Sequence, residues 1–193
     1  AISDLEVDQR EVNSKIYYIK YPIDGTDEFI TIATTRPETM LGDTAIAVNP
    51  KDDRFKLFVG KTVTIPIVGR KIKIIEDDYA DPEQGTGALK ITPAHDFNDY
   101  DVGQRNNLEI INIFTEEGKI NENAPAHYKG LDRFEARKRI LKELKEKEFF
   151  VKEENIKNKV PYGDRSNSII EPFLTEQWFA DAGKLSIKAK EVV

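Results

Sequence analysis

The first half of the chain is dominated by short segments in which apolar and polar residues alternate. Strict alternation is typical of β-strands, because successive side chains of a strand point to opposite faces of a sheet. Turn residues separate these segments, as in Asp24-Gly25, a pair typical of hairpins. The expected strands are 14–23, 28–34, 44–48, 61–68, 70–75, 87–92 and 109–114. Many short strands with few helices predict a mainly β fold with α elements, a β-barrel decorated by peripheral helices.

Two segments have helical features. Residues 131–150 carry an apolar stripe among mixed charges, with Asp132 as an N-cap and Glu135 three residues later. A second helix is expected from Pro93 onward, because proline and acidic residues favour the first turn of a helix. No repeat or composition break divides the chain, so residues 1–193 are expected to form one domain.

The charge balance limits the partners. A net charge of -6 argues against a domain that grips nucleic acid mainly through its phosphates. A nucleic-acid end could still enter a local pocket if another part of a larger protein held the rest. The chain starts at Ala1 and its only methionine is Met40, which suggests a fragment of a longer protein.

Composition also indicates a compartment. The absence of cysteine excludes disulfides and cysteine-ligated zinc, and fits a reducing environment. No apolar run approaches the roughly 20 residues of a membrane helix, and the first ten residues lack the features of a signal peptide. We therefore expect a cytoplasmic location and no membrane partner.

The stretch "ITPAHDFNDYDVGQR" at residues 91–105 concentrates His95, Asp96, Asp99 and Asp101. Zinc is not expected there, because the chain has neither cysteine nor a His-x-x-x-His pair, and the aspartate spacing does not match a calcium loop. No serine lies in a nucleophile-elbow motif. We expect neither a metal ion nor another cofactor. The cluster could simply cap a helix.

The same stretch suits recognition of an ammonium group. Asp99 could form a charge-assisted hydrogen bond with a protonated amine. Lys90 and Thr92 occupy alternate positions of the preceding strand and so point the same way. Together these side chains could address the amine, a hydroxyl and an ester of one aminoacyl group. The nearby Gly85-Thr86-Gly87 has a simpler interpretation, a turn in which glycine supplies a positive φ.

Four longer motifs carry a family resemblance. They are "TTRPETMLGDTAIAVNP", "GTGALKITPAHDFNDYDVGQR", "GLDRFEARK" and "IIEPFLTEQWF", and the likeness runs from about residue 14 to residue 178. All four resemble the inserted editing domain of valyl-tRNA synthetases. The leucyl and isoleucyl editing domains differ at Glu38, and the leucyl ones also at Phe97-Asn98, so the valyl type is the nearer match.

The resemblance implies a β-barrel with peripheral helices and a hydrolytic function. Such domains remove threonine wrongly attached to the 3′ end of valine tRNA, and threonine from threonyl-adenylate. An apolar synthetic pocket rejects the extra hydroxyl of threonine only about a hundredfold, so a second, polar site is needed. The implied partners are this tRNA end, the adenylate and the rest of a parent ligase. The chain has no His-x-Gly-His or Lys-Met-Ser-Lys-Ser motif, so it should not itself aminoacylate.

The resemblance also assigns residues. Lys90, Asp96 and Asp99 are the implied catalytic group, with Asp99 taking the ammonium. The implied substrate-binding residues are Thr92, Arg36, Thr39, Thr35, Thr34 and His95, of which Arg36 and Thr39 would line the site of the terminal adenosine. The family often has an aromatic residue for adenine stacking where this chain has Gln84.

Alternatives stay open on the sequence alone. The chain could be a non-catalytic barrel that binds a tRNA end or an amino acid, or an editing domain of the leucyl or isoleucyl type. His95 could be a general base, although a structural role is equally common beside a helix start.

Overall fold

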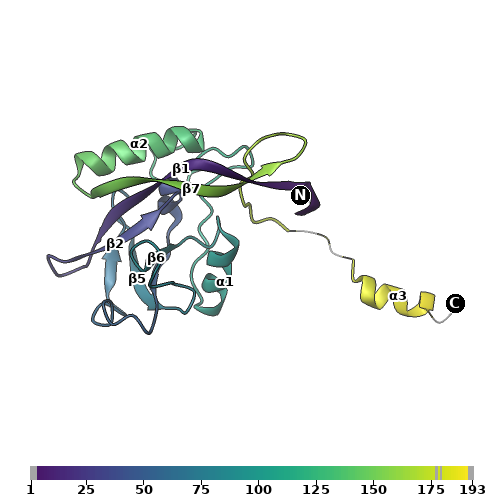
Figure 1. The fold of residues 1–193 in the computed structure, drawn as a ribbon, viewed down its shortest axis with the longest axis horizontal. Coiled ribbons are helices and arrows are strands. Elements are labelled where there is room, and N and C mark those ends of the chain that lie inside the picture. The colour runs from purple at the N-terminus through teal and green to yellow at the C-terminus, as the bar shows by residue number, and fades with distance from the viewer. Residues whose placement is uncertain (1–3, 177, 179, 191–193) are drawn as a thin grey trace.

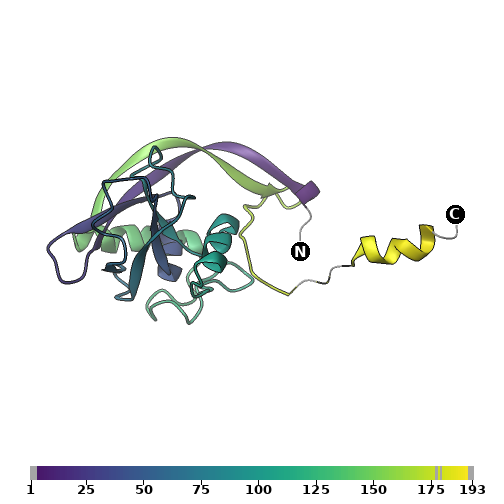
Figure 2. The same cartoon turned by 90° about the horizontal axis from the view of Figure 1, so that it is seen from below.

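The computed structural model describes residues 4–176, 178 and 180–190. Its long central strand is β1 (Val7–Pro22), which pairs antiparallel with β2 (Phe29–Thr34) on one side and β7 (Phe150–Gly163) on the other. Only the second half of β1 pairs with β2, so the first half and β7 form a two-stranded ribbon that arches away from the body (Figure 2). The inward positions of β1 carry Tyr17, Ile19 and Tyr21, which belong to the core.

The second sheet has the order β4-β5-β3-β6. Its strands are β4 (Thr62–Thr64), β5 (Lys71–Glu76), β3 (Ala45–Val48) and β6 (Ala88–Ile91), and only β3 and β5 are parallel. An isolated bridge between Ile23 and Val63 joins the two sheets. The predicted mainly β fold with peripheral helices is confirmed. Within the described residues the strands pair as two sheets, not as one closed ring.

Two strand predictions need correction, and one strand was not predicted. Residues 61–68 pair only at Thr62–Thr64, because Pro66 cannot donate a hydrogen bond and the chain turns there. Residues 109–114 form no ladder, only a bridge from Phe114 to Ile120. There the backbone N–H groups of Ile113 and Phe114 donate to side chains instead. The length of β7 was not predicted, because its charged residues hide any apolar alternation.

The helices lie on the outside of the sheets (Figure 1). They are α1 (Phe97–Arg105), α2 (Arg133–Glu146) and α3 (Ala182–Lys190), with 3-10 turns η1 (Asp4–Glu6) and η2 (Pro37–Gly42). Asp132 caps α2 as predicted, by accepting the backbone N–H of Phe134 at 2.8 Å. In both views α3 stands apart from the sheets. None of the described helices is long and apolar enough to cross a membrane.

Two apolar clusters hold the elements that carry polar residues. The larger cluster joins both sheets to α2 through Ala136, Ile140 and Leu144. The smaller one packs Val102 of α1 against Ile91 of β6. The helix α1 is thereby fixed beside the end of β6, where Lys90 and Thr92 lie.

Truncating Ile140 should destabilise the fold strongly. Ile140 is fully buried, so Ile140→Ala removes apolar contacts and leaves a cavity worth about 2–5 kcal/mol of unfolding free energy. Urea denaturation checks this value. Lys142→Ala, on the exposed face of the same helix, is the control and should change stability by less than about 0.5 kcal/mol. Equal losses in both variants would show that α2 does not pack as described.

Candidate active site

Lys90 is the centre of a buried polar group. Its side chain is only 7% exposed. The ammonium Nζ donates to Thr39 Oγ1 at 2.7 Å, to Asp43 Oδ1 at 3.1 Å and to Thr92 Oγ1. A lysine ammonium has three donors, so all of them are satisfied inside the protein. As predicted, Lys90 and Thr92 project from β6 and its end to the same side.

Asp43 completes this group and was not predicted. Its Oδ1 also accepts the Thr92 hydroxyl at 2.6 Å, and its Oδ2 accepts the Tyr21 hydroxyl at 2.7 Å. Burial raises the pKa of Asp43, while the Lys90 charge and these hydrogen bonds oppose the rise. One signal was available, since Asp43 is a lone charge between two apolar runs in "MLGDTAIAV".

The backbone around Asp43 is held tightly as well. The Arg70 guanidinium donates to the carbonyls of Leu41 and Asp43 at 2.9 and 2.8 Å. Gly42 sits so close to neighbouring chain that an added Cβ would lie 2.8 Å from the Ile111 carbonyl oxygen. These contacts fix the position from which the Asp43 carboxylate reaches Lys90.

Asp99 lies beside this group on the first turn of α1. It is 7% exposed, and its Oδ2 accepts the backbone N–H of Thr92 at 2.8 Å. Within the described residues its other oxygen has no hydrogen-bond partner. Burial raises the pKa of Asp99 to about 6, with Lys90 opposing the rise. The site therefore contains a buried carboxylate, one oxygen of which has no hydrogen-bond partner among the described residues, next to the buried Lys90 ammonium.

Asp96 lies directly before the helix that carries Asp99. The helix begins at Phe97, not at Pro93, and Asp96 is its N-cap. The carboxylate accepts the backbone N–H groups of Asn98 at 2.9 Å and Asp99 at 3.2 Å, and the residue is exposed. Helix capping, the simpler interpretation of the aspartate cluster, is thus confirmed for Asp96. Its catalytic role stays a prediction.

Two substitutions can separate capping from a charge effect at Asp96. Asp96→Ala should cost about 0.5–2 kcal/mol of unfolding free energy, because the first turn of α1 loses its acceptor. Asp96→Asn keeps the acceptor and should stay within about 0.5 kcal/mol of the original protein. Thermal or urea unfolding of both variants measures this. A loss in Asp96→Asn as large as that in Asp96→Ala would contradict the capping role.

His95 faces the interior of the protein. It is 1% exposed, its Nε2 accepts the backbone N–H of Ile113 at 3.0 Å, and its ring packs on Phe114. Burial, and then the positive charges of Arg36 and Lys90, lower the pKa of His95 to about 3. These contacts are structural, and the roles of His95 as a general base or a substrate ligand stay predictions.

Arg36 and the neighbouring threonines form a second part of the site. Arg36 Nη1 donates to the His95 carbonyl at 2.8 Å. Thr39 is buried, donates to the Arg36 carbonyl at 3.0 Å, and accepts from Lys90. Thr34 accepts the Arg36 backbone N–H at 3.0 Å. The Thr35 side chain is half-buried, with no hydrogen-bond partner in the described part of the chain. Thr39 therefore links the Arg36 loop directly to Lys90.

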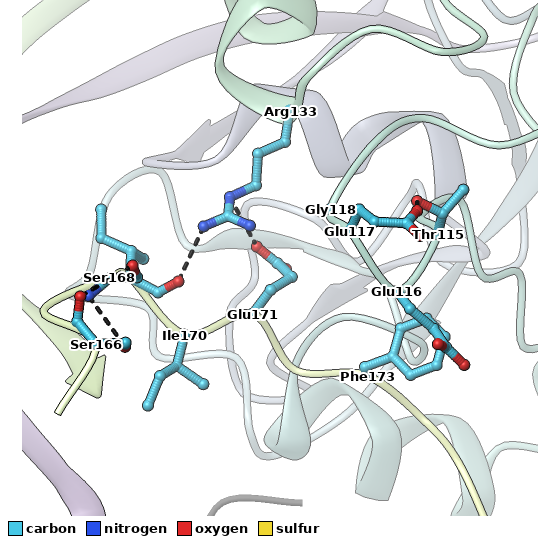
Figure 3. A pocket seen from close by; sticks show the side chains of 11 residues that line it. Thr115, Glu116, Glu117, Gly118, Arg133, Ser166, Ser168, Ile170, Glu171 and Phe173 are labelled. Atoms are coloured by element: carbon cyan, nitrogen blue, oxygen red, sulfur yellow. Dashed lines mark hydrogen bonds and ion pairs between the residues drawn. The ribbon is translucent and has the colours of Figure 1, made fainter. Parts of the chain in front are cut away.

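Glu171 is a further contact of Arg36 that the sequence did not reveal. Its carboxylate pairs with Arg36 Nη2 and lies 3.6 Å from Arg133 Nε. It lines a cavity of about 290 Å³ together with Arg133, Ile170 and Phe173 (Figure 3). Burial raises the pKa of Glu171, against the influence of Arg36 and Arg133. The motif "IIEPF" contained this residue, but nothing in its spacing pointed to Arg36.

The glycine turn matches its simpler interpretation. Gly85 and Gly87 have φ angles of 58° and 81°, which favour glycine. The amide of Gln84 donates to Asp81 at 2.9 Å. In the residues that the structure describes, no three histidine, aspartate or glutamate side chains gather as a metal site would require.

Comparison with known proteins shows to which family the chain belongs. Residues 51–145 match the family model described as "Leucyl-tRNA synthetase, editing domain". The chain is 88% identical to the valine–tRNA ligase of Pelagibacter ubique (strain HTCC1062) over 193 residues, and 53% identical to that of Thermotoga maritima over 192. The chain belongs to the editing domains of valyl-tRNA synthetases. Each alignment takes in the whole chain but only 22% of the relative's own length.

A solved structure supports the fold of this editing domain. A leucyl-tRNA synthetase from Agrobacterium radiobacter K84, in a ternary complex with tRNA and LeuAMS, superposes with a TM-score of 0.56 at 19% identity. The match covers 80% of this chain and 21% of that one. Within the editing domain, the family model includes Lys90, Thr92 and Asp99, whereas Arg36, Asp43 and Glu171 lie outside the matched range.

Proposed function

We propose that this editing domain hydrolyses threonine misattached to valine tRNA. The observation that carries the proposal is Asp99, a buried carboxylate with one oxygen unbonded among the described residues, next to the Lys90–Thr92–Asp43 group. The free oxygen of Asp99 would accept the ammonium of the aminoacyl group. The cationic Lys90 would lie on the side of the ester carbonyl, where negative charge develops during hydrolysis.

Selection of threonine over valine would follow from the buried polar group around Lys90. The hydroxyls of Thr39 and Thr92 and the Lys90 ammonium are all paired with one another or with Asp43. A threonine hydroxyl can exchange with one of these bonds and leave every group paired. The valine methyl cannot, so where it takes the place of the threonine hydroxyl at least one buried group would lose its partner, at about 1–3 kcal/mol.

The proposed reaction uses water as the nucleophile. Water adds to the ester carbonyl, the bond between that carbon and the ribose oxygen breaks, and the proton lost by the water ends on the ribose hydroxyl. No serine or cysteine belongs to the described site, and the proposal requires no cofactor. The site would orient the ester and the water, which is a major source of rate enhancement.

The partners follow from the family and the charge. We propose that the 3′ end of valine tRNA carrying threonine, and threonyl-adenylate, enter the site of a single domain. A chain with a net charge of -6 is poorly suited to bind the phosphates of tRNA. The relatives extend far beyond this chain, and their remaining parts would bind the body of the tRNA. The proposed setting is the cytoplasm.

Deacylation assays test the function. The chain, in excess over substrate, is mixed with valine tRNA that carries either threonine or valine. Release of the amino acid is then followed over time. Threonine should be released faster than without protein, and valine should not. Equal rates for both esters would reject valyl-type editing. Binding without hydrolysis would favour the non-catalytic barrel, and hydrolysis of larger apolar esters would favour a leucyl or isoleucyl type.

The reaction should weaken on acidification. The pKa of Asp99 is raised to about 6, and only the ionised form can pair with the ammonium. The value of kcat/KM, which reports the free protein, should therefore fall as the pH decreases through about 6. Rates corrected for uncatalysed hydrolysis between pH 5 and 8 provide the profile. A kcat/KM that stays flat across this range would contradict the role of Asp99.

A further inference from the structure

Five charged side chains from distant parts of the sequence form one network beside the proposed site. The arginine–glutamate network consists of Arg36, Glu38, Arg133, Arg137 and Glu171. Arg137 donates two hydrogen bonds to the Glu38 carboxylate, at 2.7 and 2.6 Å, and Glu38 is fully buried. Glu171 lies between Arg36 and Arg133, as Figure 3 shows for the Arg133 side.

The network holds the C-terminal segment against the site. Arg133 donates to the Ile169 carbonyl at 3.0 Å while pairing with Glu171. The backbone N–H of Ile170 donates to the Pro161 carbonyl at 3.0 Å. The two residues before Glu171 are thereby held in place, and the Glu171 carboxylate pairs with Arg36 from this position.

Arg36 keeps unused donors in this arrangement. One N–H of Nη1 goes to the His95 carbonyl and one of Nη2 goes to Glu171. Each of these nitrogens carries a second N–H. The side chain is 28% exposed, so part of it can be reached by a ligand. Three arginines face two glutamates in the network, which leaves one positive charge in excess within a chain of net charge -6.

We propose that Glu171 is a positioning residue, which orients Arg36 to bind the 5′-phosphate of the terminal adenosine. The inference rests on the proposed function, which brings an aminoacylated adenosine to this site. Its 5′-phosphate is the one anionic group of that nucleotide, and a guanidinium with two parallel N–H groups is well suited to a phosphate. Glu171 and the His95 carbonyl fix the plane of the guanidinium, so that its remaining donors face the phosphate.

Ligand binding to the full chain tests this inference without any ester. Calorimetry compares adenosine 5′-monophosphate with adenosine for the original chain, Glu171→Gln, Glu171→Asp and Arg36→Gln. We expect the original chain to prefer the monophosphate. Glu171→Gln should weaken monophosphate binding about 10-fold and leave adenosine binding unchanged. Glu171→Asp should recover part of the loss, and Arg36→Gln should remove the preference.

Glu116→Gln is the matched control. Glu116 lines the same cavity and is exposed, and no contact joins it to Arg36 among the described residues. Its substitution should leave both affinities unchanged. Several results would overturn the inference: unchanged or tighter monophosphate binding in Glu171→Gln, equal weakening of both ligands, or an original chain that binds the monophosphate no better than adenosine or binds neither. Because no ester is used, these results are separate from a failure of threonine hydrolysis.

Discussion

Replacing Asp99 with asparagine is expected to lower kcat/KM for threonyl-tRNA hydrolysis at least about 100-fold while the fold stays intact. Without Asp99 the substrate ammonium would enter a buried site that lacks a counter-charge, at a cost of about 3–5 kcal/mol. Asparagine keeps the size of the side chain and an oxygen that can accept the Thr92 backbone N–H. The loss should therefore come from charge, not from structure.

Stability provides the control for this prediction. The folded pKa of Asp99, about 6, lies above the value of an exposed aspartate, so the ionised carboxylate opposes folding above that pH. Removing the charge should leave the unfolding free energy at pH 7 unchanged or higher. Single-turnover deacylation and urea denaturation of Asp99→Asn measure both quantities. A variant that is fully active, or one that is inactive because it is unfolded, would contradict the assigned role.

Replacing Lys90 with methionine should have the second large effect, on stability as well as on hydrolysis. The substitution leaves the Asp43 carboxylate fully buried without its cation, which costs about 3–5 kcal/mol of unfolding free energy. Adding Asp43→Asn to Lys90→Met removes the orphaned charge and should recover part of this loss. Both variants should fail to hydrolyse threonyl-tRNA.

An exposed ion pair gives the comparison for Lys90. Lys71 pairs with Asp24 at 2.8 Å, but its side chain is 68% exposed. Lys71→Met should therefore cost no more than about 1 kcal/mol by urea denaturation. If the double variant is as unstable as Lys90→Met alone, the loss comes from packing, and the buried ion pair is not its cause.

Local patterns explain what could be predicted from the sequence. Alternation placed Lys90 and Thr92 on one side of a strand, because the two-residue period of a strand determines side-chain direction. Proximity along the chain then placed Asp99 next to them. The glycine turn and the Asp132 cap were also local features.

Contacts between distant residues could not be predicted in this way. Asp43, Tyr21 and Glu171 reach the site from other elements, and only the folded sheets and the C-terminal segment bring them there. The start of α1 was misplaced because proline suits both a helix start and a turn. In the fold, Asp96 offers the side-chain acceptor that decides where the helix begins.

A crystal structure of the chain with a non-hydrolysable threonyl-adenosine analogue tests whether Asp99 receives the ammonium of the aminoacyl group. We expect the threonine ammonium at about 2.7–2.9 Å from the Asp99 oxygen that has no hydrogen-bond partner among the described residues. The threonine hydroxyl should lie in the group formed by Lys90, Thr39 and Thr92. An analogue bound elsewhere, or with its ammonium turned away from Asp99, would contradict the role assigned to Asp99.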